Sequence, residues 1–220
     1  MGGIAYHVMN RVSGEQELFQ DNGDYEAFER VLAEARERAG MRVCAYALMP
    51  NHFHLVLWPR KDGDLSRFMQ WLTMTHTQRW HAHRHSAGHG HLYQSRFKSF
   101  PIQANPHFLS VCRYVERNAM RAKLVKRAED WPWCSLACRE RKLDKGVALL
   151  DDWPVDRPRG WRRRVNEPQS EKELDRLHAC LRRGKPYGDE AWTRRTAVKL
   201  GLESSLRPVG RPRKVTGKAE

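Results

Sequence analysis

The order of its apolar segments most constrains what this chain can fold into. Runs of β-branched and aromatic residues predict four strands, over residues 4–12, 41–48, 52–58 and 93–103. Apolar residues at helical spacing predict two helices, one from a cap at Asp24 to Gly40 and one over residues 65–84. The chain therefore reads strand, helix, strand, strand, helix, strand.

That order is typical of a ferredoxin-like α+β fold, a four-stranded sheet with both helices on one face. The strand over residues 52–58 is expected in the centre of this sheet, which leaves its other face open to a further element. Pro106 opens a third helix, which continues through Tyr114 to Met120. This helix is expected to meet the open face.

The central strand carries two histidines separated by one apolar residue. His52 and His54 project from the same face of a strand because side chains alternate, and Phe53 points to the opposite face. Two neutral imidazoles on one face can bind a divalent metal ion. A single His-x-His pattern also fits one core and one surface histidine, and the neighbouring tyrosine helix favours the metal site.

On the third helix, Tyr114 and Asn118 are one turn apart and share a face. The amide oxygen of Asn118 could serve as a further metal ligand, and the phenol of Tyr114 could attack a phosphodiester once a metal or cations activate it. The alternatives are a tyrosine packed in the core and an asparagine at a solvated or capping position. The pattern indicates metal-assisted phosphodiester chemistry.

The charge of the chain indicates a polyanionic partner. Its 220 residues include 40 Lys and Arg against 26 Asp and Glu, a net charge of +14 with a sequence pI near 10.0. Nucleic acid is the commonest ligand of so basic a surface, although a merely solvated surface can share this composition. Residues 1–12 lack an apolar signal core, and no apolar run approaches a membrane span, so we expect a cytoplasmic, nucleoid-associated protein that binds no membrane.

Two further groups of residues are weak candidates for metal sites. The five cysteines are odd in number and form no Cys-x-x-Cys pair, so neither disulfides nor a ribbon-type zinc site is indicated. Six histidines gather further along the chain without the spacing of a structural zinc site, and we interpret them as a basic, DNA-facing surface or loop: His76, His81, His83, His85, His89 and His91.

Three separated motifs occur together in this chain: Met-Pro-Asn-His-Phe-His-Leu-Val-Leu over residues 49–57, Gly-His-Leu-Tyr-Gln-Ser-Arg-Phe-Lys over residues 90–98, and Tyr-Val-Glu-Arg-Asn over residues 114–118. In this order they resemble the single-tyrosine HUH transposases. The resemblance is greatest to the REP-associated tyrosine transposases, relatives of the IS200/IS605 group. It covers about residues 4–138 and, patchily, the tail. Ala119 stands where this family often has proline, and alanine favours an unbroken helix.

The resemblance implies a metal-dependent endonuclease that cleaves and rejoins single-stranded DNA beside a folded hairpin through a 5′-phosphotyrosine intermediate. It implies that Tyr114 is the nucleophile and that His52, His54 and Asn118 bind Mg²⁺ or Mn²⁺. The other readings are a non-catalytic regulator that binds hairpins and a metal-binding protein built on the histidine cluster. Whether the protein is a monomer or a homodimer stays open, as does whether the tyrosine serves its own chain's metal site.

DNA contacts are expected from basic residues near the site and in the tail. The candidates near the site are Arg96, Lys98, Arg113, Arg117 and Arg121, and those in the tail are Arg207, Arg211, Arg213 and Lys214. Gly210, Arg211 and Pro212 match the core of a motif that enters the minor groove of A·T-rich DNA, and a plain basic tail explains them equally well.

The chain is expected to have three parts. Residues 1–138 form the HUH transposase-like catalytic domain, and residues 139–206 form a basic extension with short helices over 171–183 and 189–200. Residues 207–220 are a basic tail that is disordered when free. The last seventy residues hold 18 Lys and Arg against 11 Asp and Glu, about double the density of net charge in the first 150.

Overall fold

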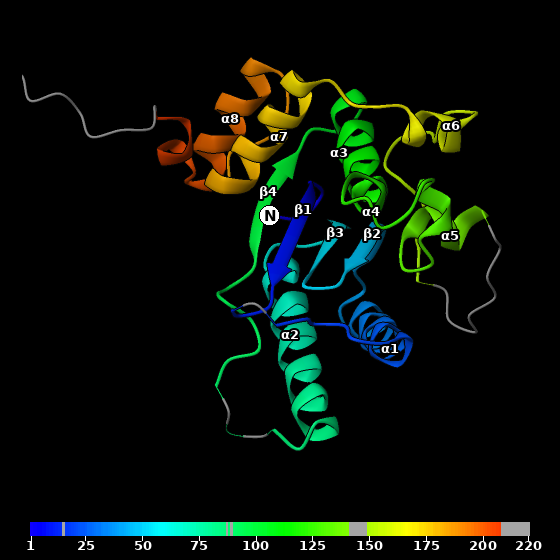
Figure 1. Ribbon diagram of the computed structural model, residues 1–220. Helices are drawn as coiled ribbons and strands as arrows, with labels where there is room; N and C mark the ends of the chain where they lie inside the picture. The colour runs from blue at the N-terminus through cyan, green and yellow to red at the C-terminus, as the bar shows by residue number, and fades with distance from the viewer. Residues whose placement is uncertain (15, 87, 89, 141–148, 208–220) are drawn as a thin grey trace, which may run out of the picture.

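A four-stranded antiparallel sheet forms the centre of the protein (Figure 1). The computed structural model describes residues 1–14, 16–86, 88, 90–140 and 149–207. The strands are β1 (Ala5–Arg11), β2 (Arg42–Met49), β3 (His52–Trp58) and β4 (Lys98–Ile102), in the spatial order β2-β3-β1-β4. This order, with two helices on one face, confirms the ferredoxin-like α+β fold.

Helices α1 (Asn22–Ala39) and α2 (Asp64–His83) cover one face of the sheet, on the side away from α3 (Figure 1). Phe28 of α1 and Phe68 of α2 pack with Phe53 of β3 in a core without exposed surface. The predicted cap of α1 was wrong by one turn. The cap is Asp21, whose side chain accepts the backbone N–H of Asp24, and Asp24 itself is buried against Arg84.

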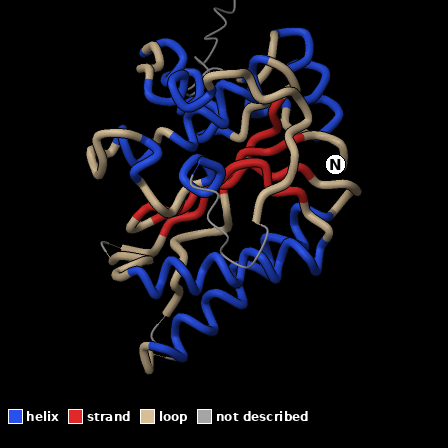
Figure 2. Tube along the Cα trace, turned by 90° about the vertical axis from the view of Figure 1, so that its right-hand side faces the viewer, coloured by secondary structure: helices blue, strands red, loops and turns tan. Residues whose placement is uncertain are grey.

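The opposite face of the sheet carries a second core, built on α3 (Pro106–Glu116). Phe108 and Val111 of α3 pack against Val56 and Phe100 of the sheet. Figure 2 shows the strands as a layer between the two groups of helices. Helices α5 (Ser135–Glu140) and α6 (Trp161–Asn166) are attached to α3 through the buried carboxylate of Glu116, which accepts hydrogen bonds from Ser135 Oγ at 2.6 Å and Trp161 Nε1 at 2.6 Å.

The third helix is interrupted, contrary to the expectation from Ala119. α3 ends at Glu116, Arg117 forms a turn, and a short helix α4 (Asn118–Arg121) follows. Arg117 Nη1 donates to the carbonyl oxygens of Val165 at 3.0 Å and Asn166 at 2.5 Å. Helix propensity does not include this contact with a distant segment.

The predicted strand over residues 93–103 is half as long in the structure, because β4 begins only at Lys98. Tyr93 forms an isolated bridge to Val12, Gln94 donates its N–H to Arg11 O, and residues 95–97 belong to no strand. Residues 93–97 line a groove beside α2.

The C-terminal part of the chain packs along both edges of the sheet. Tyr187 exchanges backbone hydrogen bonds with the β4 edge through Pro101 O and Gln103 N. On the other edge, Asp151 donates its backbone N–H to Val43 O of β2 and accepts the N–H of Val43 with its carboxylate. Helices α7 (Glu171–Arg183) and α8 (Glu190–Leu200) confirm the two predicted amphipathic helices, and short 3₁₀ turns lie at Ala128–Asp130 and Glu203–Leu206.

Because Trp161, Leu177 and Tyr187 share the second core with α3, the described extension packs directly on the predicted catalytic domain. The boundary at residue 138 stays a prediction. Most of the expected disordered tail and its minor-groove motif lie outside the described residues. Among the described residues, no helix combines the length and apolar character that crossing a membrane needs.

Candidate active site

His52 and His54 lie at the start of β3 and form the centre of the candidate site. Strand alternation places both rings on the face that α3 covers, with their centroids 4.9 Å apart and their planes nearly perpendicular. His54 is 2% exposed, and His52 is half-buried. The predicted pair therefore shares one face of the strand.

A third histidine, His7 of β1, joins the pair and was missed by sequence reasoning. Its Nε2 lies 3.0 Å from Nδ1 of His54, and its ring stacks on Phe100 at 4.8 Å. The available signal was its position in an apolar strand, which places it on the same face as Ala5 and Met9. Only the pairing of β1 with β3 brings this position beside His54.

All three histidines are held in their neutral form. Burial lowers the pKa of His7 to about 3 and the pKa of His52 to about 4, where Arg11 and Arg121 contribute as well. Burial also lowers the pKa of His54 well below its usual range. Neutral imidazole is the form that binds a metal ion, so near pH 7 no proton competes for the site.

Tyr114 lies against these histidines from α3. Its ring meets His54 edge-on at 5.8 Å and His7 at 6.2 Å between centroids. His178 of α7 packs on it at 5.9 Å, and only 5% of the tyrosine is exposed. Burial raises the pKa of the phenol above its usual value, and the nearby Arg121 guanidinium opposes part of that rise. The phenol is therefore protonated at rest near neutral pH.

Asn118 and Arg121 complete the described site. Arg121 donates from Nη2 to Asn118 Oδ1 at 3.2 Å, and its guanidinium carbon lies 5.4 Å from the centre of the Tyr114 ring. Asn118 Nδ2 is buried without a hydrogen-bond partner. Such an N–H donor is costly unless an acceptor binds it, so the amide fits a site that a water or a phosphate oxygen completes.

The residues present fit a divalent metal ion. Two neutral imidazoles and one amide oxygen suit Mg²⁺ or Mn²⁺ when water or phosphate oxygens fill the remaining positions. The predicted third ligand is the amide of Asn118, one helical turn after Tyr114. Among the described residues, no group of three His, Cys, Asp or Glu side chains is arranged to bind a metal.

The predicted DNA-contacting arginines fall into two groups. Arg113 donates to the carbonyl oxygens of Glu167 and Pro168, as Arg117 does to those of Val165 and Asn166. Arg117 therefore holds the end of α6 and Arg113 the loop that follows it, roles that the helical pattern does not reveal. Arg96, Lys98 and Arg207 are exposed, and Arg121 lies in the site. Arg211, Arg213 and Lys214 lie outside the described residues.

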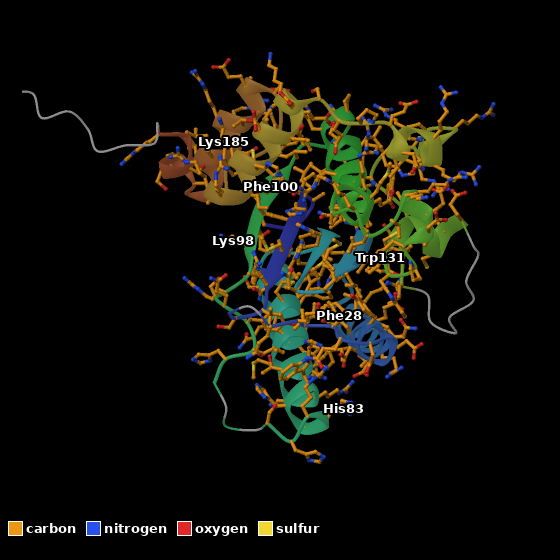
Figure 3. All side chains as sticks on the ribbon, in the orientation of Figure 1. Phe28, His83, Lys98, Phe100, Trp131 and Lys185 are labelled. Atoms are coloured by element: carbon orange, nitrogen blue, oxygen red, sulfur yellow. The ribbon has the colours of Figure 1, made fainter. Side chains whose placement is uncertain are left out.

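The histidine cluster is divided by the structure. His76 is 3% exposed and its Nδ1 lies 2.8 Å from the hydroxyl of Tyr93, so the expectation of a surface role was wrong for this residue. The ring belongs to the core because α2 turns this face toward Phe28. His83 lies at the end of α2, far from the sheet (Figure 3). His89 lies outside the described residues.

A groove of about 1020 Å³ lies between α2 and residues 91–97. Tyr93, Phe97 and Met69 supply its apolar surface, and the polar lining comes from amide, hydroxyl, imidazole and guanidinium groups: Asn10, Ser66, Gln70, Thr73, His91, Gln94, Ser95 and Arg96. Asn10 is next to Arg11, which pairs with His52 in the sheet. The groove therefore starts near the end of β1 that pairs with His52. It lies on the opposite face of the sheet from the two histidines of β3.

The chain matches known proteins in sequence and in fold. The family described as "Transposase IS200 like" matches residues 1–118. A solved structure of a REP-associated tyrosine transposase bound to a REP hairpin is similar, with a TM-score of 0.54 and 17% sequence identity. The match covers 72% of this chain and 94% of that one.

A structure of a proposed transposase from Deinococcus radiodurans has a TM-score of 0.39 and 15% identity. That match covers 55% of this chain and 87% of the other. No curated protein matches the sequence. At 17% identity the structure of the REP-associated transposase bears on the fold of the described chain, and the family match bears on its class.

Proposed function

Because the chain belongs to the IS200-like transposase family, we propose that it is a metal-dependent endonuclease that cleaves and rejoins single-stranded DNA beside hairpins. The observation that carries this proposal is the placement of Tyr114 against His54, with Asn118 and Arg121 beside them. A nucleophile, two imidazoles that can bind a metal, an amide and a cation meet in one site on one chain. This placement favours a tyrosine that serves its own chain's metal site.

Tyr114 would attack the scissile phosphorus. The phenol loses its proton, a bond forms between its oxygen and phosphorus, and the bond from phosphorus to the 3′-oxygen breaks. The departing 3′-oxygen gains a proton, so the protein holds the 5′ end as a phosphotyrosine and releases a 3′-hydroxyl. Arg121 lies where it can stabilise the phenolate and the phosphate. Attack by a 3′-hydroxyl reverses the step without an external energy source.

His52, His54 and Asn118 would hold the metal ion. When bound, Mg²⁺ or Mn²⁺ supplies Lewis-acid polarisation of the phosphate oxygen. The family and the donor set support this assignment, since both imidazoles are neutral and can each offer a lone pair.

Hairpin DNA is the proposed substrate. The solved REP-associated transposase with the same fold binds a REP hairpin, and this chain has the positive charge that binding to DNA requires. The groove beside α2 would receive unpaired bases next to the hairpin, because its aromatic rings can stack on bases and its amides can read base edges.

Gln94→Ala tests the groove. Gln94 is exposed and lines the groove, so its loss removes a base-edge contact without disturbing the core. We expect roughly tenfold weaker binding of a hairpin with its single-stranded flank. Binding of the blunt hairpin should not change. Fluorescence anisotropy with both DNAs measures the difference, and an equal effect on the two would count against a groove that reads unpaired bases.

Arg96→Ala tests the electrostatic contribution. Arg96 is exposed on the rim of the groove, where a phosphate contact would release one counterion. The slope of log affinity against log salt should become shallower by about 0.7, the value for one phosphate of a single strand. Arg30→Ala removes the same charge from α1, where Arg30 pairs with Glu26, and should leave the slope unchanged. Equal slopes in wild type and Arg96→Ala would show that Arg96 contacts no phosphate.

A non-catalytic hairpin-binding regulator is the second candidate. It would keep the basic surface and the groove, and it would need neither Tyr114 nor the metal ligands. The clustering of those four side chains in one buried site favours the enzyme.

Covalent capture separates the two functions. The protein is mixed with heat-denatured genomic DNA of its host and Mn²⁺ or Mg²⁺, denatured in detergent, and protein-linked strands are sequenced. An endonuclease yields strands that share one junction beside a hairpin. If no strand is captured while hairpin DNA still binds, the protein is a non-catalytic regulator that binds hairpins.

A further inference from the structure

We propose that His7 is a positioning residue that holds His54 in the tautomer needed for metal binding, and that Asn51 does the same for His52. The inference depends on the proposed function, because it takes the two histidines of β3 as metal ligands. It adds two residues that neither the His-x-His pattern nor the tyrosine motif includes.

The tautomer of His52 follows from its partner. A neutral imidazole has one N–H and one lone pair, and a metal ion binds the lone pair. His52 Nδ1 lies 2.6 Å from Asn51 Oδ1. An amide oxygen only accepts, so Nδ1 carries the proton and donates. The lone pair of His52 is therefore on Nε2, which is left for the metal.

His54 is engaged through the same ring nitrogen. Its Nδ1 lies 3.0 Å from His7 Nε2 in a contact that excludes water. Nε2 is then the nitrogen of His54 left for a metal, and it offers a lone pair only if Nδ1 carries the proton. Nδ1–H of His54 must therefore donate to Nε2 of His7, which places the proton of His7 on its own Nδ1.

His7 is suited to this role by its packing. It is fully buried, stacks on Phe100 with an angle of 25° between the planes, and has Tyr114 at its edge. Its Nδ1 is buried without a partner. A purely structural residue here would be better apolar, since a buried polar atom without a hydrogen bond costs stability. The contact with His54 gives the imidazole a function that phenylalanine could not supply.

Metal titration of three variants, with wild type alongside, tests the inference without measuring cleavage. His7→Phe keeps an aromatic ring against Phe100 and removes the acceptor, and His7→Gln offers an amide oxygen in place of Nε2. His52→Ala removes a metal ligand. Calorimetry gives the Mn²⁺ affinity of the full chain, and circular dichroism checks the fold. Long-range ¹⁵N–¹H spectra of the histidine-labelled wild type in Mg²⁺ identify each tautomer directly.

We expect His7→Phe to weaken Mn²⁺ binding by roughly 10- to 100-fold. His7→Gln should restore most of the affinity. In wild type with Mg²⁺, the protons of His52 and His54 should both be on Nδ1. Wild-type affinity in His7→Phe, or a proton on Nε2 of metal-bound His54, overturns the proposal, and the spectra decide even if a variant fails to fold.

Direct ligation by His7 also overturns the proposal, and it would appear as a metal-induced shift of the His7 Nε2 signal. A different result would contradict the proposed function itself. If wild type binds neither ion more tightly than His52→Ala, the metal site itself is wrong. If binding depends on His52 but not on His7, only the positioning role is lost.

Discussion

Tyr114→Phe is expected to reduce DNA cleavage by roughly 10⁶-fold, the loss typical of removing a covalent nucleophile. The substitution deletes only the phenol oxygen. The ring contacts with His54, His178 and Arg121 remain, so the site keeps its packing. Hairpin affinity should not change, because none of the proposed DNA contacts involves this oxygen. Cleavage of a labelled hairpin with its flank, and gel detection of the covalent complex, measure the loss.

The matched control is Tyr25→Phe. Tyr25 is a buried tyrosine of α1 that stacks on Trp133, on the opposite face of the sheet from the site. The same chemical change there should leave cleavage and covalent capture intact. Residual cleavage by Tyr114→Phe at the wild-type rate would mean that another group attacks the phosphate, and the assignment of the nucleophile would be wrong.

The second large effect is a steep loss of stability in acid. Burial lowers the pKa of His76 from 6.5 to about 3, so the folded state keeps this ring neutral while the unfolded chain binds a proton below pH 6.5. The stability that the neutral His76 ring contributes is therefore fully present above pH 6.5 and is lost as the pH falls toward 3. Over this window each such histidine lowers the free energy of unfolding by about 1.4 kcal/mol per pH unit. The three histidines of the site act in the same direction.

Urea denaturation at several pH values between about 7.5 and 5 gives the free energy of unfolding at each pH and so tests this for His76. His76→Asn keeps a polar atom near Nδ1 for Tyr93, and should make the slope shallower by about 1.4 kcal/mol per pH unit. The control, His83→Asn, changes an exposed histidine of the same helix and should leave the slope as in wild type. Equal slopes for His76→Asn and wild type would mean that His76 takes up a proton without unfolding.

The site residues in the motifs could be predicted from the sequence because rules that act over a few neighbouring residues determine where they lie. Alternation along one strand puts His52 and His54 on one face, and the helix from Pro106 carries Tyr114 to that face. Local rules also predicted α7, whose cap is a serine and whose stop is a glycine. They failed at Asp24, which pairs with Arg84 while Asp21 caps the helix, and at Arg117, which binds Asn166 where the helix is interrupted.

By itself, the sequence determined the ferredoxin-like order, the histidine strand and the tyrosine helix, because periodicity and turn residues act over a few neighbouring positions. Only the tertiary structure decided that His7 meets His54, that Arg117 and Arg113 bind the end of α6 and the loop after it, and that His178 covers Tyr114. These partners are separated by 47 to 64 residues. Strand pairing and helix docking bring them together, and no local pattern encodes which distant side chains will then face each other.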